Sequence, residues 1–464
     1  MNEKPADRAS SPFVAQGHRR TLRRVALASV VCLFGLTACA HRLDIDSATG
    51  AQRADGAPAG SLHHEADPVV FRFATVGDSR QDPTYPDPST LVPPITGQLL
   101  AQDAFWLQNS RAWSRIVQTI STQRAQMLIV NGDMVMGGGL TRVPAAWSTK
   151  PPSVSEVADS DIARLYRQYA YWRGMVAGLF ESGTYVLPLP GNHEVQCDPA
   201  VTRIADGCAK GKRTYQENEQ AWRDNMGDLI LDRRRFKDVV GMEPTDVLGD
   251  TTPSAPGAED GVTTDQSKLT YSFDVNTPGG RLHFALLNTY AVGVDGAAPI
   301  RWLENDLQAA RARGARGVFV FGHKPAFRYD YLAARGKPMR PEGLDPREPG
   351  KTAGSERFWQ VIAQNGATYF AGHEHIFHIQ NYPAANSQRG AWQVLVGSGG
   401  SPFEFRMEGK CPQCRVPALN EPTDRHYAWA TVSVHQSGRV SLEAWGFDEH
   451  YGPTTRLLAI DSLQ

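Results

Sequence analysis

The chain has 464 residues, of which 41% are hydrophobic and 21% charged, so it has ample apolar material for a packed core. Its formal net charge is −1. Nucleic-acid-binding proteins usually carry a basic excess, so this balance argues against a polyanion-binding surface, and we expect no nucleic-acid partner.

The N-terminus is typical of an export signal. Basic residues at positions 18–24 lead into an apolar stretch, 25–36, that is too short to span a bilayer as a mature helix. The stretch ends in Leu36-Thr37-Ala38-Cys39, which resembles a bacterial lipobox; a plain secretory signal is the alternative. We therefore expect residues 1–39 to be a lipoprotein signal peptide, with the mature protein anchored to a membrane through lipidated Cys39 and facing the periplasm or the cell exterior. Without residues 1–39, which carry six Lys or Arg and two Asp or Glu, the formal net charge is −5.

Residues 40–68 are rich in Ala, Gly, Asp and Ser and lack periodicity, which predicts a flexible tether. Residues 69–464 are expected to form one domain. Its four cysteines are Cys197, Cys208, Cys411 and Cys414. An even number in an exported chain favours disulfides, and pairing of neighbours is the simplest of the three connectivities. A redox role for the last two is the alternative, although they lie in a Pro-rich stretch that opens no helix.

Several short apolar runs end in a glycine that is followed by a polar residue able to bind metal. The runs are 71–76, 127–130, 185–190, 318–321 and 368–371. Runs of roughly four to eight apolar residues between turn signals predict strands that are buried on both faces. Glycine lets the chain turn sharply after each of them. In such sheets a ligand site lies beyond the carboxyl ends of the strands.

Helical patterns separate these runs, at 105–124, 161–181, 215–226, 299–313 and 355–364. Strands that alternate with helices predict an α/β layer with crossover connections. Later strand patterns follow one another with fewer helices, at 269–275, 281–289, 393–397, 428–435 and 439–445. They suggest a second sheet packed on the first. Polar loops are expected at 137–160, 244–268, 328–353 and 401–426.

The residues at the predicted strand ends form a set suited to metal binding. They are Asp78, Asp133, Asn192, His193, His323, His373 and His375. Oxygen and imidazole ligands together suit Zn, Mn or Fe. A carboxylate between two such ions can bridge them at about 3.5–4 Å, generate a metal-bound hydroxide near neutral pH and clamp a phosphoryl group.

The ordered motifs carry a resemblance to a known family. They are Gly77-Asp78, Gly132-Asp133, Gly191-Asn192-His193-Glu194, Gly322-His323 and Gly372-His373-Glu374-His375. Over about 71–445 the sequence resembles the calcineurin-like metallophosphoesterase superfamily, and Val320-Phe321-Gly322-His323 is similar to a motif of its purple acid phosphatases. The resemblance implies an α/β fold of two packed mixed β-sheets flanked by helices, the four-layer αββα sandwich. It also implies a metal-dependent phosphate-ester hydrolase with a dinuclear centre and a metal-bound hydroxide.

The resemblance further implies a role for each residue. Asp133 would bridge two divalent or trivalent ions, of Mn, Fe or Zn. Asp78 and His375 would complete the first metal site, and the second would be completed by Asn192, His323 and His373. His193 would face a phosphorylated small-molecule substrate, as leaving-group acid or transition-state partner. Glu374 would point away from the site.

Two departures concern the first metal. Where the family has Asp-x-His or Asp-x-Gly, this chain has Asp78-Ser79-Arg80, and Met136 replaces the tyrosine of the purple enzymes. The first ion therefore has one protein ligand fewer than usual, and no tyrosinate-to-iron absorption is expected. Arg80 is expected either to bind a phosphate oxygen as a catalytic residue or to pair with a carboxylate such as Asp82.

The same motifs leave other functions open. A phosphodiesterase or a nucleotide pyrophosphatase would use the same metals. A non-catalytic lipoprotein that keeps a degenerate metal-binding or phosphate-binding site is a further alternative, and Arg80 is the residue that favours it.

Overall fold

The computed structural model describes residues 67–80, 110–135, 137, 145–158, 161–196, 214–251, 262, 264–328, 344, 352–384, 390–401 and 426–463. All of them belong to the unit Glu65–Gln464. Several sequence-based expectations fall outside these ranges: the signal peptide with Cys39, the tether up to residue 66, the four cysteines of the domain, Asp82 and Met136. Within the described ranges, no helix has the length and apolar character needed to cross a membrane.

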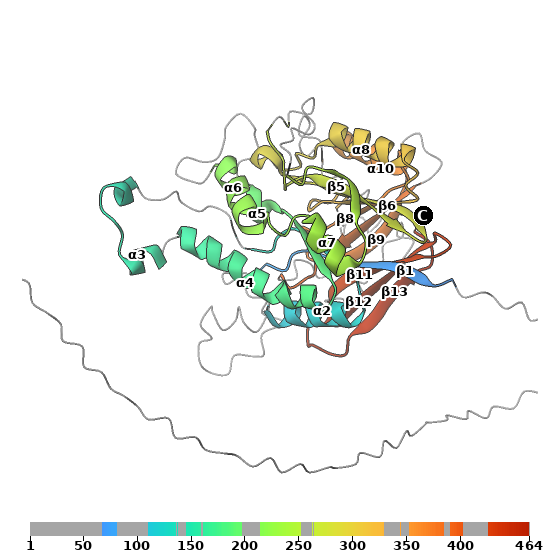
Figure 1. Ribbon diagram of the computed structural model, residues 1–464, viewed down its shortest axis with the longest axis horizontal. Helices are drawn as coiled ribbons and strands as arrows, with labels where there is room; N and C mark the ends of the chain where they lie inside the picture. The colour runs from blue at the N-terminus through green and yellow to red at the C-terminus, as the bar shows by residue number, and fades with distance from the viewer. Residues whose placement is uncertain are drawn as a thin grey trace, which may run out of the picture. The chain divides into compact units, whose positions relative to one another are not determined.

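Two mixed β-sheets form the centre of this unit (Figure 1). The six-stranded sheet has the order β13 (Thr455–Ile460), β12 (Val440–Asp448), β11 (His426–His435), β1 (Val69–Val76), β2 (Met127–Asn131) and β3 (Tyr185–Leu189). The seven-stranded sheet has the order β4 (Pro244–Leu248), β5 (Tyr271–Thr277), β6 (Gly280–Leu286), β7 (Gly317–Phe321), β8 (Thr368–Ala371), β10 (Ala391–Val396) and β9 (Phe377–Tyr382). Parallel pairs join β1, β2 and β3 on one side of the first sheet, where β3 is the edge strand, and join β6, β7, β8 and β10 within the second sheet.

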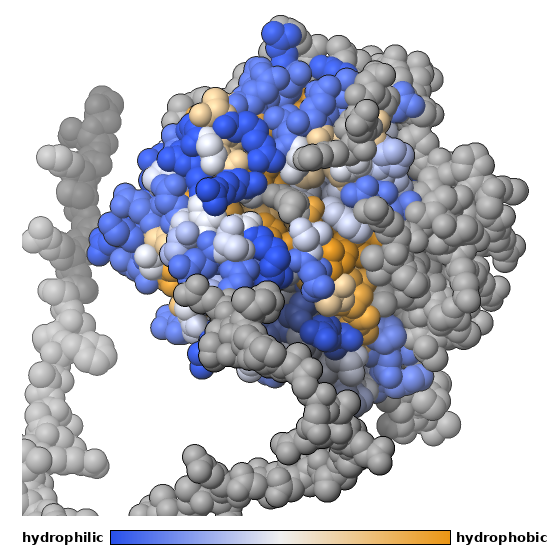
Figure 2. Space-filling view, turned by 90° about the vertical axis from the view of Figure 1, so that its right-hand side faces the viewer, coloured by the Kyte–Doolittle hydropathy of each residue, from blue (hydrophilic) through white to orange (hydrophobic). Residues whose placement is uncertain are grey.

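Aromatic side chains fill the space between the two sheets. Phe73 of β1 lies against four phenylalanines of the other sheet, with ring centroids 5.0 to 6.0 Å apart: Phe284, Phe319, Phe321 and Phe370. All five rings are fully buried. Edge-to-face pairs of this kind stabilise a core by about 0.5–1.5 kcal/mol each beyond the area that they bury. On the face shown in Figure 2, the described surface is mostly hydrophilic, with a smaller apolar area.

Helices cover the outer faces of both sheets, which confirms the predicted four-layer arrangement. The α-helices of the described ranges are α2 (Arg111–Thr122), α3 (Val154–Ala158), α4 (Asp161–Glu181), α5 (Asn192–Val195), α6 (Tyr215–Met226), α7 (Arg233–Val240), α8 (Ile300–Ala312) and α10 (Thr352–Gln364). Beside the six-stranded sheet, α2 packs on α4 through the stacked rings of Trp113 and Trp172. On the other side, Leu303 of α8 and Ile362 of α10 share a core cluster with Val320 of β7.

The distribution of strands between the sheets corrects one expectation. The later strands do not form a sheet of their own, because β11 pairs antiparallel with β1 and carries β12 and β13 into the first sheet. Conversely, β7 and β8 belong to the second sheet. Strand β4 also lies within the expected loop 244–268. Pairing between strands far apart in the chain, such as Val69 with His435, leaves no signal in local periodicity.

Candidate metal centre

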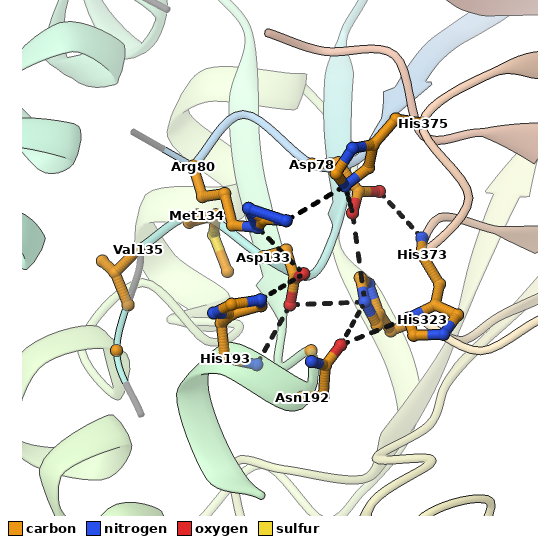
Figure 3. Close-up of polar contacts among 12 residues, drawn as sticks. Asp78, Arg80, Asp133, Met134, Val135, Asn192, His193, His323, His373 and His375 are labelled. Carbon is orange, nitrogen blue, oxygen red and sulfur yellow. Dashed lines mark hydrogen bonds and ion pairs between the residues drawn. The ribbon is translucent and has the colours of Figure 1, made fainter. Parts of the chain in front are cut away.

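Five loops bring the predicted residues together at one end of the two sheets. Asp78 and Arg80 follow β1, and Asp133 follows β2. Asn192 and His193 open the short helix α5 after β3. His323 follows β7, and His373 and His375 follow β8. Figure 3 shows their side chains converging, as strand ends with glycine-led polar residues predict.

Glycine is required where these loops touch. Gly132 has φ +78°, and a Cβ on it would lie 2.5 Å from Nδ1 of His323 and 2.7 Å from the Cα of Gly191. A Cβ on Gly372 would collide with a carboxylate oxygen of Asp78. Asp78, Asp133 and His373 themselves have positive φ angles of 59°, 54° and 73°. Such backbone strain in residues other than glycine is concentrated at functional sites.

His323 directs a ring nitrogen at the oxygens of the site. Its Nδ1 lies 2.7 Å from the carbonyl oxygen of Asn131 and donates to it, which leaves Nε2 facing the site. Nε2 is 3.0 Å from Oδ1 of Asn192, 3.3 Å from Oδ1 of Asp133 and 4.0 Å from Oδ1 of Asp78. Burial works against a charge on His323, yet Asp133 and Asp78 raise its pKa to about 9. The surrounding carboxylates therefore favour a positive charge at this point.

These residues fit a metal ion. Ligand atoms of Asp78, Asp133 and His323 all lie within 4.8 Å of one another, and the three side chains are buried. Oδ1 of Asp78 has no hydrogen-bond partner in the described part of the chain. A buried carboxylate oxygen without a partner is costly unless a cation satisfies it. The oxygen and imidazole donors are those that Mn, Fe and Zn accept.

Asn192 and His373 lie on the same side of Asp133. Oδ1 of Asn192 is 3.2 Å from Nδ1 of His373, which also lies 3.3 Å from the hydroxyl of Tyr290. Burial, together with the charges of His323 and Lys324, holds the pKa of His373 well below its usual value. A neutral imidazole keeps a lone pair for a metal. The set expected for the second ion is therefore assembled around Oδ1 of Asp133.

The other oxygen of Asp133 faces Arg80. Nε of Arg80 is 3.4 Å from Oδ2 of Asp133, and Nη2 is 3.3 Å from Nε2 of His375 (Figure 3). Nε2 of His375 in turn lies 3.5 Å from Oδ1 of Asp78. Burial alone would raise the pKa of Asp133, but His323, His193 and Arg80 hold it well below its usual range. Arg80 thus lies among the three residues that were expected to hold the first ion.

His193 lies at the open side of the centre. Its backbone N–H donates to Oδ1 of Asp133 at 3.1 Å, and its Nε2 is 3.7 Å from Oδ2 of the same residue. The His193 side chain is 20% exposed, whereas those of His323 and Asp133 are 0% and 3% exposed. Of these three side chains, it is the one most able to meet a substrate from solvent.

Glu194 has a structural role that sequence reasoning missed. Its carboxylate accepts hydrogen bonds from the backbone N–H groups of Asp133 at 2.9 Å, Met134 at 2.7 Å, Val135 at 3.0 Å and Gly191 at 2.7 Å. Burial and the charge of Asp133 raise its pKa to about 7, while the N–H donors favour the ionised form. The available signal was its place in the Gly191-Asn192-His193-Glu194 motif.

Two further contacts complete the surroundings. Between His373 and His375, the carboxylate of Glu374 forms an ion pair with Nε of Arg328 at 3.1 Å. The turn after β10 lies directly behind Asp78, because the N–H of Ser401 donates to the carbonyl of Asp78 at 2.8 Å and that of Gly399 to the carbonyl of Gly77 at 3.0 Å. The sequence predicts a plain turn at Ser398-Gly399-Gly400, with an approach to the rim of the metal centre as the alternative.

Comparison with known families identifies this arrangement. The model of the calcineurin-like phosphoesterases matches residues 72–377, which is well over half of the chain and includes each of the loops described above. The chain belongs to the calcineurin-like phosphoesterase family. No curated protein matches this phosphoesterase in sequence.

Solved structures resemble this phosphoesterase at low sequence identity. A purple acid phosphatase from yellow lupin (Lupinus luteus) is 10% identical with a TM-score of 0.47, over 85% of this chain and 54% of the lupin chain. A dimetal phosphatase from Danio rerio is 12% identical with a TM-score of 0.42, over 86% of this chain and 100% of the other. PhoD is 11% identical with a TM-score of 0.44, over 86% of this chain and 73% of the other. The phosphoesterase thus spans about half the length of the lupin protein.

Proposed function

We propose that this phosphoesterase hydrolyses phosphate esters of small molecules at the metal centre. The observation that carries the proposal is the convergence of Asp78, Asp133 and His323, whose ligand atoms lie within 4.8 Å of one another. Membership of the calcineurin-like phosphoesterase family supports the same reaction class.

Each of the two carboxylate oxygens of Asp133 faces a position where a positive charge, from a metal ion or a side chain, can lie. When bound, a divalent or trivalent ion of Mn, Fe or Zn would supply activated water and neutralise charge on the phosphoryl oxygens. The family resemblance predicts an ion at both positions, in a dinuclear centre. The position on the Oδ1 side, with Asn192, His323 and His373, is the better supported one, because Arg80 already contacts Oδ2.

His193 is proposed to act on the leaving group. Its side chain is partly exposed and its Nε2 lies 3.7 Å from Oδ2 of Asp133, so a protonated ring would face a leaving group that enters from solvent. From this position the proton can pass to the ester oxygen as the bond to phosphorus breaks. Arg80 is proposed to hold a phosphoryl oxygen with its forked donors.

One observation favours a second function. The guanidinium of Arg80 lies where the family resemblance places a metal, which fits a non-catalytic protein that binds phosphate or one ion at a degenerate site. A phosphodiesterase or nucleotide pyrophosphatase would use the same residues as the phosphatase.

A panel of substrates separates these functions. We would strip purified protein of metal with a chelator, restore Mn, Fe or Zn singly, and assay a phosphomonoester, a phosphodiester and a nucleoside triphosphate. Metal-dependent phosphate release from the monoester supports the proposal. Exclusive cleavage of the diester or the pyrophosphate bond assigns one of the related activities, and retained metal without turnover of any substrate assigns the binding protein.

We also propose that the phosphoesterase is an exported lipoprotein. The basis is the basic lead at 18–24, the apolar stretch 25–36 and the lipobox-like sequence that ends in Cys39. This anchor would hold the metal centre near a membrane, on its periplasmic or outer side.

A further inference from the structure

Arg80 contacts two of the residues that the first metal ion would need. Its Nε lies 3.4 Å from Oδ2 of Asp133, and its Nη2 lies 3.3 Å from Nε2 of His375. Asp78 completes this set, with its Oδ1 3.5 Å from the same nitrogen of His375. Figure 3 shows the guanidinium lying between Asp133 and His375.

The hydrogen bond to His375 decides which ring nitrogen holds a proton. A guanidinium can only donate hydrogen bonds, so Nε2 of His375 must accept from Arg80. The lone pair that would bind an ion is therefore directed at an Arg80 N–H. In this form, Nε2 of His375 has no lone pair available for a metal ion.

Arg80 also supplies a charge of its own. Its side chain is only 10% exposed, and a guanidinium does not lose its proton in proteins. A divalent ion bound beside it would face a fixed positive charge at close range in a buried site. Arg80 thus already balances the negative charge of the Asp133 carboxylate at Oδ2, while His323 and Asn192 lie on its Oδ1 side.

Two departures of the sequence from the family pattern concern the first metal ion. Arg80 stands where a His or Gly is usual, and Met136 stands where the purple enzymes have a tyrosine ligand. Together they leave the first ion one protein ligand short, and neither changes a residue around Oδ1 of Asp133.

We infer that the guanidinium of Arg80 takes the place of the first metal ion. The protein then binds one ion per chain, next to Asp78, Asp133, Asn192, His323 and His373, and Arg80 provides the second positive charge for the phosphoryl group. This inference rests on the proposed function, because it concerns the metal content of the same centre.

The test counts ions bound to metal-free protein during titration with Mn²⁺, by calorimetry and elemental analysis. Wild type should bind one ion. Arg80→His, which removes the guanidinium and offers an imidazole, should bind two. The matched control is Arg115→Ala on α2, whose guanidinium donates to the carbonyls of Tyr451 and Gly452, and it should bind one ion like wild type. Electron paramagnetic resonance should show coupled Mn²⁺ ions in Arg80→His alone.

Two results would overturn the inference while leaving the proposed function intact. One is two coupled ions in wild-type protein that releases phosphate. The other is a folded Arg80→His protein, judged by near-ultraviolet circular dichroism, that binds no more Mn²⁺ than wild type. If Arg80→His does not fold, the wild-type count decides. A wild-type protein that binds no Mn²⁺, Fe²⁺ or Zn²⁺ and releases no phosphate would instead refute the proposed function itself, and this inference with it.

Discussion

The buried carboxylate of Glu194 accepts a hydrogen bond from the backbone N–H of Asp133 at 2.9 Å. The N–H groups of Met134, Val135 and Gly191 donate to the same carboxylate. One side chain thereby joins the loop after β2 to the loop after β3. It holds Asp133 in its left-handed conformation, with φ 54°, and so fixes where its two oxygens point.

Glu194→Gln should weaken both the fold and the metal site. The new amide replaces an acceptor oxygen with a donor that faces N–H groups, and a lost hydrogen bond to a charged group costs about 1.5–3 kcal/mol. We expect the free energy of unfolding to fall by about that amount in urea denaturation, and metal affinity to fall with it. Glu156→Gln is the control, since Glu156 lies on the exposed helix α3 and its hydrogen bonds within the described ranges are local, to Ser153. Equal stability of the two variants would contradict this role for Glu194.

His283 should make stability depend on pH. Its Nδ1 lies 2.7 Å from Asp274 and its Nε2 3.0 Å from Asp306, in a buried network that Arg281 and Arg313 join at Asp274. Burial opposes a charge on the ring, but the two carboxylates raise the pKa of His283 overall. Its stabilising contribution is complete below the unfolded pKa of about 6.5 and is lost as pH rises through the folded value.

The pKa of Asp274 shifts the opposite way, because His283 and Arg313 outweigh its burial and lower it. Its contribution is therefore lost in acid, as pH falls through the folded value. His283→Gln should lower the free energy of unfolding near neutral pH and flatten the decline above about pH 6.5. The control is His450→Gln, whose side chain is 77% exposed. Denaturation curves across this pH range that keep the wild-type slope in His283→Gln would rule the explanation out.

The proposed lipid anchor gives a prediction about location. Cys39→Ser removes the thiol that would carry the lipid, so the variant should leave the membrane fraction or accumulate as uncleaved precursor. Fractionation of cells followed by detection of the protein measures this. Membrane association and processing that match wild type would show that Cys39 is not the anchor.

Much of the fold and of the metal centre could be predicted from local sequence patterns. The convergence of the polar residues at strand ends, such as Asp133 and His323, could be predicted, because a short buried strand and the glycine turn after it are both encoded by a few neighbouring residues. Strand order was not readable, because β1 meets β11 across more than three hundred intervening residues. Helix α7 was also missed, although Asp232 caps its start and Gly241 ends it in a left-handed conformation.

The placement of single side chains was harder to predict than that of loops. From the sequence, Arg80 could either contact a phosphate or pair with Asp82. The choice could not be made because the partners of a long side chain are brought near only by tertiary structure. The structure directs it to Asp133 and His375. Glu194 was missed as a structural residue for a similar reason, since most of its backbone partners lie about sixty residues earlier in the chain.

Asp133→Asn tests the central claim most directly, with metal content and phosphate release measured on the same preparation. Asp133 lies between Arg80 and the ligands on its Oδ1 side. The amide side chain of Asp133→Asn should therefore bind less metal. We expect kcat/KM to fall by at least about 100-fold, which is the upper end of the losses seen when residues behind metal ligands are changed. Asp232→Asn is the matched control, because asparagine caps the start of α7 as well as aspartate does and it lies outside the centre. The account predicts normal metal content and turnover in the control and loss of both in a folded Asp133→Asn protein. Wild-type metal content and full phosphate release in Asp133→Asn would contradict it.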